Sequence, residues 1–167
     1  MLQLIYYPDP VLQKRAEPID HIDEDTKKLT SEMFEVMYEN KGIGLAAPQV
    51  GILKRVVTVD ISGSEKRNSP LVLINPEIIK QEGEEESEEG CLSLPGFKCK
   101  IKRSSLIHVK YTDLEGQEKT LDARDMLAIC LQHEIDHLNG KLIIDYAGRL
   151  RRSMYEKKLK KMKKKRR

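Results

Sequence analysis

Two histidines enclose a glutamate in residues 133–137 (HEIDH), and this segment is the strongest chemical signal in the sequence. Histidines four positions apart project from one face of a helix, so the imidazoles of His133 and His137 can bind the same metal ion. Glu134 lies beside them, where its carboxylate can accept a proton from a water at the metal. Apolar neighbours predict a buried helix, in which a carboxylate requires a partner or a function. The segment therefore predicts a metal site that performs hydrolysis.

A catalytic metal site usually has three protein ligands and one open position, so a third ligand is required. The third histidine of a metzincin would fall at Ile143, which excludes that class. Glu156 follows His137 by 19 residues, close to the spacing of the glutamate ligand in thermolysin-like enzymes. It lies in a lysine-rich segment, which is an unfavourable wall for a dry metal site. A zinc endopeptidase with Glu156 as ligand therefore stays open as an alternative.

The three cysteines are the other candidate ligands. An odd number of cysteines, without an export signal at the start of the chain, favours thiols over disulfides. Cys130 precedes His137 by seven residues, about 10.5 Å along a helix, so we interpret it as a core or pocket residue. Cys99 lies between two lysines in a predicted strand, which indicates a packing role. Cys91 lies in a segment bounded by glycine and proline (residues 89–96), and spacing alone leaves it an open candidate.

Three separated segments together resemble the peptide deformylase family. They are residues 42–49 (GIGLAAPQ), 89–93 (EGCLS) and 133–137 (HEIDH), in the order and at about the spacing of that family. The start of the chain, residues 7–12 (YPDPVL), is also similar. The resemblance covers about residues 1–148, whereas the acidic residues 84–86 and the long basic tail lie outside the family pattern.

The resemblance implies a divalent metal held by Cys91, His133 and His137, with water at the fourth position. The metal in this family is usually Fe²⁺, and zinc or nickel can occupy the same site; a Cys–His–His set suits several metals. The implied reaction is hydrolysis of the N-formyl group from the initiator methionine of newly synthesised polypeptides. It would release formate and a free amine in the cytoplasm.

The resemblance also implies roles for residues around the metal. Glu134 would transfer the proton, and the side-chain amide of Gln49 and the backbone N–H of Leu92 would donate to the formyl oxygen. Gly44, without a Cβ, would let its backbone pair with an extended substrate peptide. An apolar slot for the methionine side chain would be lined by Ile43, Ile129, Cys130 and the ring of His133.

The elements that would position these residues indicate an α+β fold, with a mostly antiparallel sheet around a central buried helix. Helices are predicted from Asp23 or Asp25 to about Asn40, over residues 124–138 with a C-cap at Asn139-Gly140, and after Asp145. Strands are predicted over residues 55–61, 71–80 with a break at Asn75-Pro76, 100–111 and 118–121, with a hairpin turn at 113–116. Residues 62–69 are predicted as a polar loop, and the acidic run 82–89 as a solvated loop or sheet edge.

The charge divides the chain into an acidic body and a basic tail. Residues 149–167 contain 12 basic residues and one acid, whereas the other 148 residues carry a net charge of −8. We therefore expect a catalytic domain over 1–148 and a helical tail over 149–167, with Leu150, Met154, Leu159 and Met162 forming a narrow apolar stripe. The tail is either a solvated helix or a contact to ribosomal RNA.

Composition restricts the other function classes. No apolar run approaches the roughly 18 residues of a membrane helix, so we expect no membrane partner. Two Phe and no Trp offer no aromatic platform for single-stranded nucleic acid. A ribosome- or RNA-binding protein with a structural metal is the third hypothesis. An open coordination position argues against it, because structural sites have four protein ligands.

Overall fold

The computed structural model describes residues 2–165 and has an α+β architecture with two antiparallel sheets. The larger sheet has the strand order β1-β2-β3-β6-β7, and the smaller sheet pairs β4 with β5. The strands are β1 (Gly44–Ala46), β2 (Val56–Val59), β3 (Leu71–Glu82), β4 (Glu85–Cys91), β5 (Leu94–Arg103), β6 (Leu106–Thr112) and β7 (Glu118–Arg124). The helices are α1 (Glu24–Glu39), α2 (Gly63–Lys66), α3 (Asp125–Leu138) and α4 (Arg149–Lys165), with 3₁₀ turns η1 (Pro10–Gln13), η2 (Ala47–Val50) and η3 (Ile143–Tyr146).

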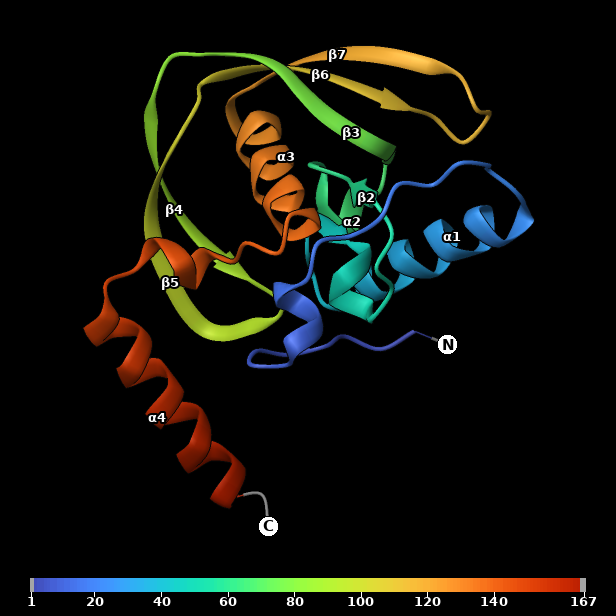
Figure 1. The fold of residues 1–167 in the computed structure, drawn as a ribbon. Helices are drawn as coiled ribbons and strands as arrows, with labels where there is room; N and C mark the ends of the chain where they lie inside the picture. Colours follow the sequence, from blue (N-terminus) through green and yellow to red (C-terminus); the bar gives the residue numbers. More distant parts are fainter. Residues whose placement is uncertain (1, 166–167) are drawn as a thin grey trace.

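Helix α3 lies in the middle of the fold, as predicted from its apolar residues. Figure 1 shows β3, β6 and β7 passing over it, β4 and β5 beside it, and α1 on the opposite side. Ala128, Leu131, Ile135 and Leu138 are buried against strands of the larger sheet. The helix ends as expected from its sequence, because Gly140 takes a left-handed conformation (φ +75°) that favours glycine. The central helix therefore carries its polar residues into the interior on a rigid support.

Helix α1 begins where a capping residue was expected. The carboxylate of Asp23 accepts a hydrogen bond from the backbone N–H of Thr26 at 3.0 Å. Met33, Val36 and Met37 are buried in a second core that includes residues of β1, β2 and β3. This packing supports the short strand β1, which borders the central helix.

Several predicted elements were wrong in detail. Residues 62–69, predicted as a loop, contain the short helix α2. Strand β3 continues through Asn75-Pro76 as a bulge, where the Asn75 side chain forms hydrogen bonds with the backbone N–H and C=O of Ile19. The predicted strand 100–111 is two strands in different sheets, since the chain leaves β5 after Arg103 and enters β6 at Leu106. The acidic run, predicted as a solvated loop or a sheet edge, is largely strand β4, an edge strand that pairs with β5 in the smaller sheet.

Helix α4 extends away from the body (Figure 1), and its main contact with the body is made by Tyr155, a residue outside the predicted apolar stripe. Tyr155 is buried against the rings of Tyr7 and Phe97. Of the predicted stripe, Leu159 packs against the same cluster, whereas Leu150 and Met154 are 73% and 60% exposed. Tyr155, which the stripe had omitted, and Leu159 therefore anchor the helix. In the described part of the chain, no helix is long and apolar enough to cross a membrane.

Candidate active site

Three candidate ligands converge between β4 and α3. Cys91 lies at the end of β4, and His133 and His137 project from α3. The Cys91 Sγ lies 3.3 Å from Nε2 of His137, and the Nε2 atoms of the two histidines are 3.2 Å apart. Tetrahedral ligands at 2.0–2.3 Å from one ion are separated by about 3.3–3.6 Å, so one thiolate and two imidazoles at these separations fit a divalent metal.

Glu89 and Arg103 orient the ring of His133. The Nδ1 of His133 lies 3.0 Å from Oε1 of Glu89, and Arg103 donates to both carboxylate oxygens of Glu89 at 2.6 and 2.8 Å. Burial raises the pKa of Glu89, but the hydrogen bonds from Arg103 and His133 outweigh it and bring that pKa to about 2. An ionised carboxylate accepts hydrogen bonds only, so Nδ1 of His133 carries the proton and Nε2 is free to bind a metal.

Glu134 is buried next to the three ligands. Its side chain is 4% exposed, and its Oε1 has no hydrogen-bond partner among the described residues. Burial raises the pKa of Glu134 to about 7. A carboxyl group with such a pKa can accept and release a proton near neutral pH.

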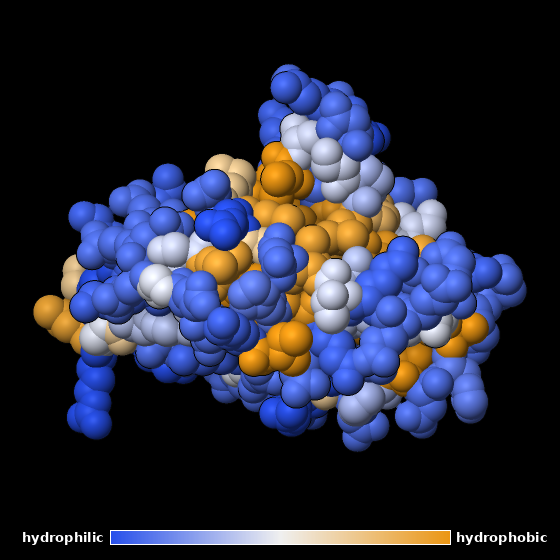
Figure 2. Space-filling view, turned by 90° about the horizontal axis from the view of Figure 1, so that it is seen from above, coloured by the Kyte–Doolittle hydropathy of each residue, from blue (hydrophilic) through white to orange (hydrophobic). Residues whose placement is uncertain are grey.

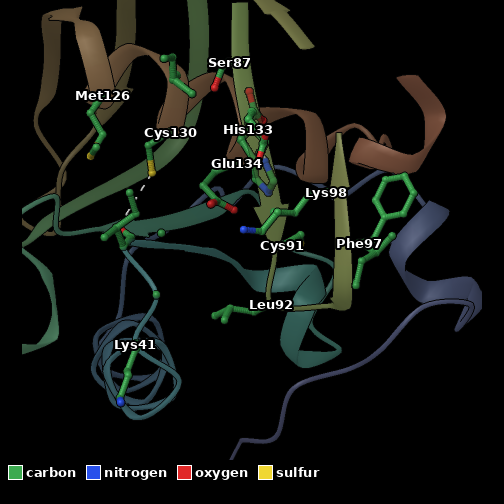
Figure 3. Close-up of a pocket in the computed structure, with 18 of the residues that line it drawn as sticks. Lys41, Ser87, Cys91, Leu92, Phe97, Lys98, Met126, Cys130, His133 and Glu134 are labelled. Carbon is green, nitrogen blue, oxygen red and sulfur yellow. Dashed lines mark hydrogen bonds and ion pairs between the residues drawn. The ribbon is translucent and has the colours of Figure 1, made fainter. Parts of the chain in front are cut away.

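A cavity of about 680 Å³ opens beside Glu134. Figure 3 shows Cys130, His133 and Glu134 projecting from α3 toward this cavity, with Cys91 and Leu92 on the facing strand and turn. The residues predicted for a methionine slot all line it: Ile43, Ile129, Cys130 and His133. Gly44, predicted to pair with the substrate backbone, lines it as well. Figure 2 shows that apolar side chains also gather in a hollow on one face of the molecule, bordered by hydrophilic ones.

Comparison with known proteins identifies the family. A family model described as polypeptide deformylase matches residues 1–153. The chain belongs to the polypeptide deformylase family. It is 50% identical to a peptide deformylase of Nitrosococcus oceani over 161 residues, which cover 96% of this chain and 95% of that protein. It is 52% identical to a peptide deformylase of Thermodesulfovibrio yellowstonii over 160 residues, 96% of this chain and 97% of the relative.

Solved structures of the family have the same fold. A peptide deformylase from Legionella pneumophila superimposes with a TM-score of 0.92 at 41% identity, covering 99% of this chain and 97% of that chain. A peptide deformylase from Synechococcus elongatus in complex with actinonin gives a TM-score of 0.88 at 41% identity, covering 94% of this chain and 86% of that chain. The predicted α+β class and the resemblance to the family are thereby confirmed. The family is metal-dependent, and the Cys91, His133 and His137 cluster could hold its metal.

The two alternative functions do not fit these findings. Glu156 lies on α4 and accepts a hydrogen bond from the hydroxyl of Tyr7 at 2.6 Å. Among the described residues, the side chains that converge with His133 and His137 at metal-binding distance include Cys91 and not Glu156. The zinc endopeptidase hypothesis is therefore wrong. Membership of a deformylase family also replaces the hypothesis of an RNA-binding protein with a structural metal.

In this deformylase fold, the amide of Gln49 is held in a defined orientation. Its side chain is 2% exposed, and its Oε1 accepts from the backbone N–H of Ala46 at 3.0 Å. Its Nε2 therefore points the other way, 3.2 Å from Oγ of Ser93 and 3.6 Å from Sγ of Cys91. Leu92 is half-buried and lines the same cavity. Both residues predicted to bind the formyl oxygen thus lie beside the cysteine.

Sequence reasoning missed Glu89, Arg103 and several residues of the cavity wall, among them Ser87, Phe97 and Met126. Glu89 is part of the EGCLS segment and directly precedes Gly90, so its position offered a signal. Arg103 gave no such signal, because it lies 14 residues further along the chain and meets Glu89 only where β4 and β5 pair. Met126 lies in the predicted central helix and Ser87 in the acidic run, where neither was given a site role, and Phe97 lies outside every predicted element.

Proposed function

We propose that this member of the polypeptide deformylase family hydrolyses the N-formyl group of formylmethionyl polypeptides and releases formate and a free amino terminus. The observation that carries the proposal is Glu134. Its buried Oε1, which has no hydrogen-bond partner in the described part of the chain, lies beside the Cys–His–His cluster at the wall of a cavity with apolar lining. An unpartnered buried carboxylate is costly for folding, which supports a functional role.

Cys91, His133 and His137 would hold one divalent ion, which we propose to be Fe²⁺, with zinc or nickel able to replace it. When bound there, such an ion supplies a Lewis acid for the formyl oxygen and lowers the pKa of a water. Glu89 keeps the proton of His133 on Nδ1, and so holds Nε2 in the form that binds a metal.

Glu134 accepts the proton of the attacking water and delivers it to the departing amine nitrogen. A general base and acid in this position contributes about 10²–10⁴-fold in rate. The side-chain amide of Gln49 and the backbone N–H of Leu92 donate to the formyl oxygen as it gains negative charge. One such donor is worth about 10²–10³-fold in kcat.

The methionine side chain of the substrate occupies the slot between Ile43, Ile129 and Cys130. The backbone of Gly44 pairs with the peptide as an added strand, since β1 is an edge strand of the larger sheet. An unformylated peptide is rejected because its ammonium group has no carbonyl to present and brings positive charge to a cationic centre.

Residues 1–148 form the catalytic unit in this proposal, and the basic tail 149–167 docks to ribosomal RNA. Residues 149–167 contain 12 of the 30 lysines and arginines of the chain and only one acid. Phosphate contacts by lysine and arginine weaken steeply as salt increases. Arg151, Arg152 and Tyr155 contact the body near the start of the helix, whereas Lys160, Lys161 and Lys163 are exposed and available to a partner.

The test is formate release from a formyl-Met peptide and from its acetyl-Met counterpart, with the chain loaded separately with Fe²⁺, Ni²⁺ and Zn²⁺. We expect formate from the formyl peptide and at least 100-fold slower hydrolysis of the acetyl peptide, whose extra methyl group must enter the same site. The proposal is wrong if none of the three loaded forms releases formate.

A further inference from the structure

Arg103 is a buried cation at the end of β5 that donates four hydrogen bonds to three residues. It is 5% exposed. Its guanidinium donates to Glu89 through Nε and Nη2. Through Nη1 it donates to Asp136 at 2.8 Å and to the hydroxyl of Tyr146 at 3.3 Å. Buried guanidinium groups with a bidentate carboxylate partner have a fixed orientation, because the planar fork matches the carboxylate. This position is therefore built to hold its neighbours in place.

One branch of this network leads to His133. Arg103 occupies both oxygens of Glu89, and Oε1 of the same carboxylate lies 3.0 Å from Nδ1 of His133. Rotation of the Glu89 carboxylate would break at least one hydrogen bond from Arg103. The direction and the proton position of the His133 ring thus depend on a residue that does not touch it.

The other branch holds the helix that carries both histidines. Asp136 lies on α3 directly before His137, and its carboxylate accepts from Arg103 and, at 2.7 Å, from Tyr146. Glu89 lies on β4 two residues before Cys91. Arg103 therefore ties the strand that bears the cysteine to the helix that bears the histidines.

We propose that Arg103 is a positioning residue of the metal centre, which sets the separation of β4 from α3 and orients His133 through Glu89. This inference rests on the proposed function, because the positions of the ligands matter only if they bind a metal. Replacement of residues that orient metal ligands typically lowers metal affinity or activity by about 10–100-fold.

The test compares Arg103→Met and Arg103→Lys with the unchanged chain and with Lys102→Met. Lys102 is the next residue on β5, carries the same charge and is exposed. Affinity for Co²⁺ is measured by competition with a chelator, and the absorption spectrum of the Co²⁺ form reports the ligand geometry. We expect about 10–100-fold weaker binding and a changed spectrum for Arg103→Met, a smaller loss for Arg103→Lys, and no change for Lys102→Met.

A double-mutant cycle with Glu89→Gln tests whether Arg103 acts through Glu89. Glutamine keeps an acceptor for His133 without the buried charge, so the double variant Arg103→Met/Glu89→Gln also folds where Arg103→Met alone is too unstable. If Arg103 acts through Glu89, the losses of Co²⁺ affinity in the two single variants overlap. We therefore expect the double variant to bind Co²⁺ at least about tenfold more tightly than the two single losses multiplied together would give. Independent, multiplicative losses would overturn action through Glu89.

The outcomes separate this inference from the proposed function. If the unchanged chain binds no divalent metal and releases no formate, the proposed function fails. If the unchanged chain binds Co²⁺ and releases formate, while the folded Arg103→Met variant binds Co²⁺ within threefold and keeps the spectrum, the positioning role alone is wrong.

Discussion

Gly44 offers a quantitative test of how Glu134 is held. A Cβ at this position would lie 2.6 Å from Oε2 of Glu134 and 2.7 Å from Sγ of Cys130. Real Cβ contacts essentially never fall below 3.0 Å, and ordinary contact begins at 3.4 Å. The glycine is therefore required to leave room for the carboxylate, in addition to any pairing of its backbone with substrate.

The Gly44→Ala substitution must displace the carboxylate of Glu134 by about 0.8 Å to reach ordinary contact. A misplacement of about 1 Å in a catalytic group costs on the order of 10²-fold in rate, which corresponds to about 2.7 kcal/mol of transition-state stabilisation. Because Gly44 has no left-handed backbone conformation, alanine introduces no strain there, and the chain should fold.

The assay is steady-state formate release from a formyl-Met peptide, with kcat and KM determined separately. Displacement of Glu134 predicts a kcat about 10²-fold lower with bound metal unchanged. Gly148→Ala is the matched control, because a Cβ there meets no atom within 4 Å. A raised KM with kcat within threefold of the unchanged chain would refute the reasoning, and would show that the Cβ obstructs the peptide instead.

Three further predictions concern redox chemistry, pH and the tail. The Fe²⁺ form should lose activity in air through oxidation of iron or Cys91, while the Ni²⁺ form stays active; an air-stable iron form with a freely alkylated Cys91 would contradict this. Burial raises the pKa of Asp60, but hydroxyl donors from Ser62 and Tyr38 outweigh it and lower that pKa below 3.8. The contribution of ionised Asp60 to the free energy of unfolding is therefore complete above about pH 5 and is lost as the pH falls through the pKa of Asp60 in the folded protein. In urea unfolding, Asp60→Asn should lower the free energy of unfolding by about 1–3 kcal/mol at pH 7, and by progressively less below pH 4. Truncation after Leu159 removes seven basic residues but keeps the anchored part of α4, so it should preserve peptide hydrolysis and weaken co-sedimentation with ribosomes at low salt; equal sedimentation would refute docking by the tail.

The central helix and its motif could be predicted from the sequence because their signals are local. Apolar residues at helical spacing and an Asn-Gly C-cap located α3 to within one residue of its observed start at Asp125 and at its end, Leu138. The i and i+4 spacing placed His133 and His137 on one face, and their Nε2 atoms do meet. Local periodicity is enough where one element supplies the geometry.

Features that depend on contacts between distant segments could not be predicted. Nothing in residues 100–111 marks the point where the chain passes from one sheet to the other, because both halves have strand propensity. The partner of Arg103 is set by how β4, β5 and α3 meet, and no local pattern indicates it. Tyr155 was overlooked on α4 because a helix with scattered apolar residues offers several faces, and the contact with Tyr7 selects one.

The Glu134→Gln variant tests the central claim most directly, with formate release and bound metal measured on the same preparation. Glutamine keeps the size of the side chain but cannot accept the proton, and Glu134 is not among the three converging ligands. We predict one metal ion per chain and a rate of formate release lowered by about 10²–10⁴-fold. Loss of the metal, or turnover within threefold of the unchanged chain, would contradict the assignment of Glu134 as the proton-transfer residue.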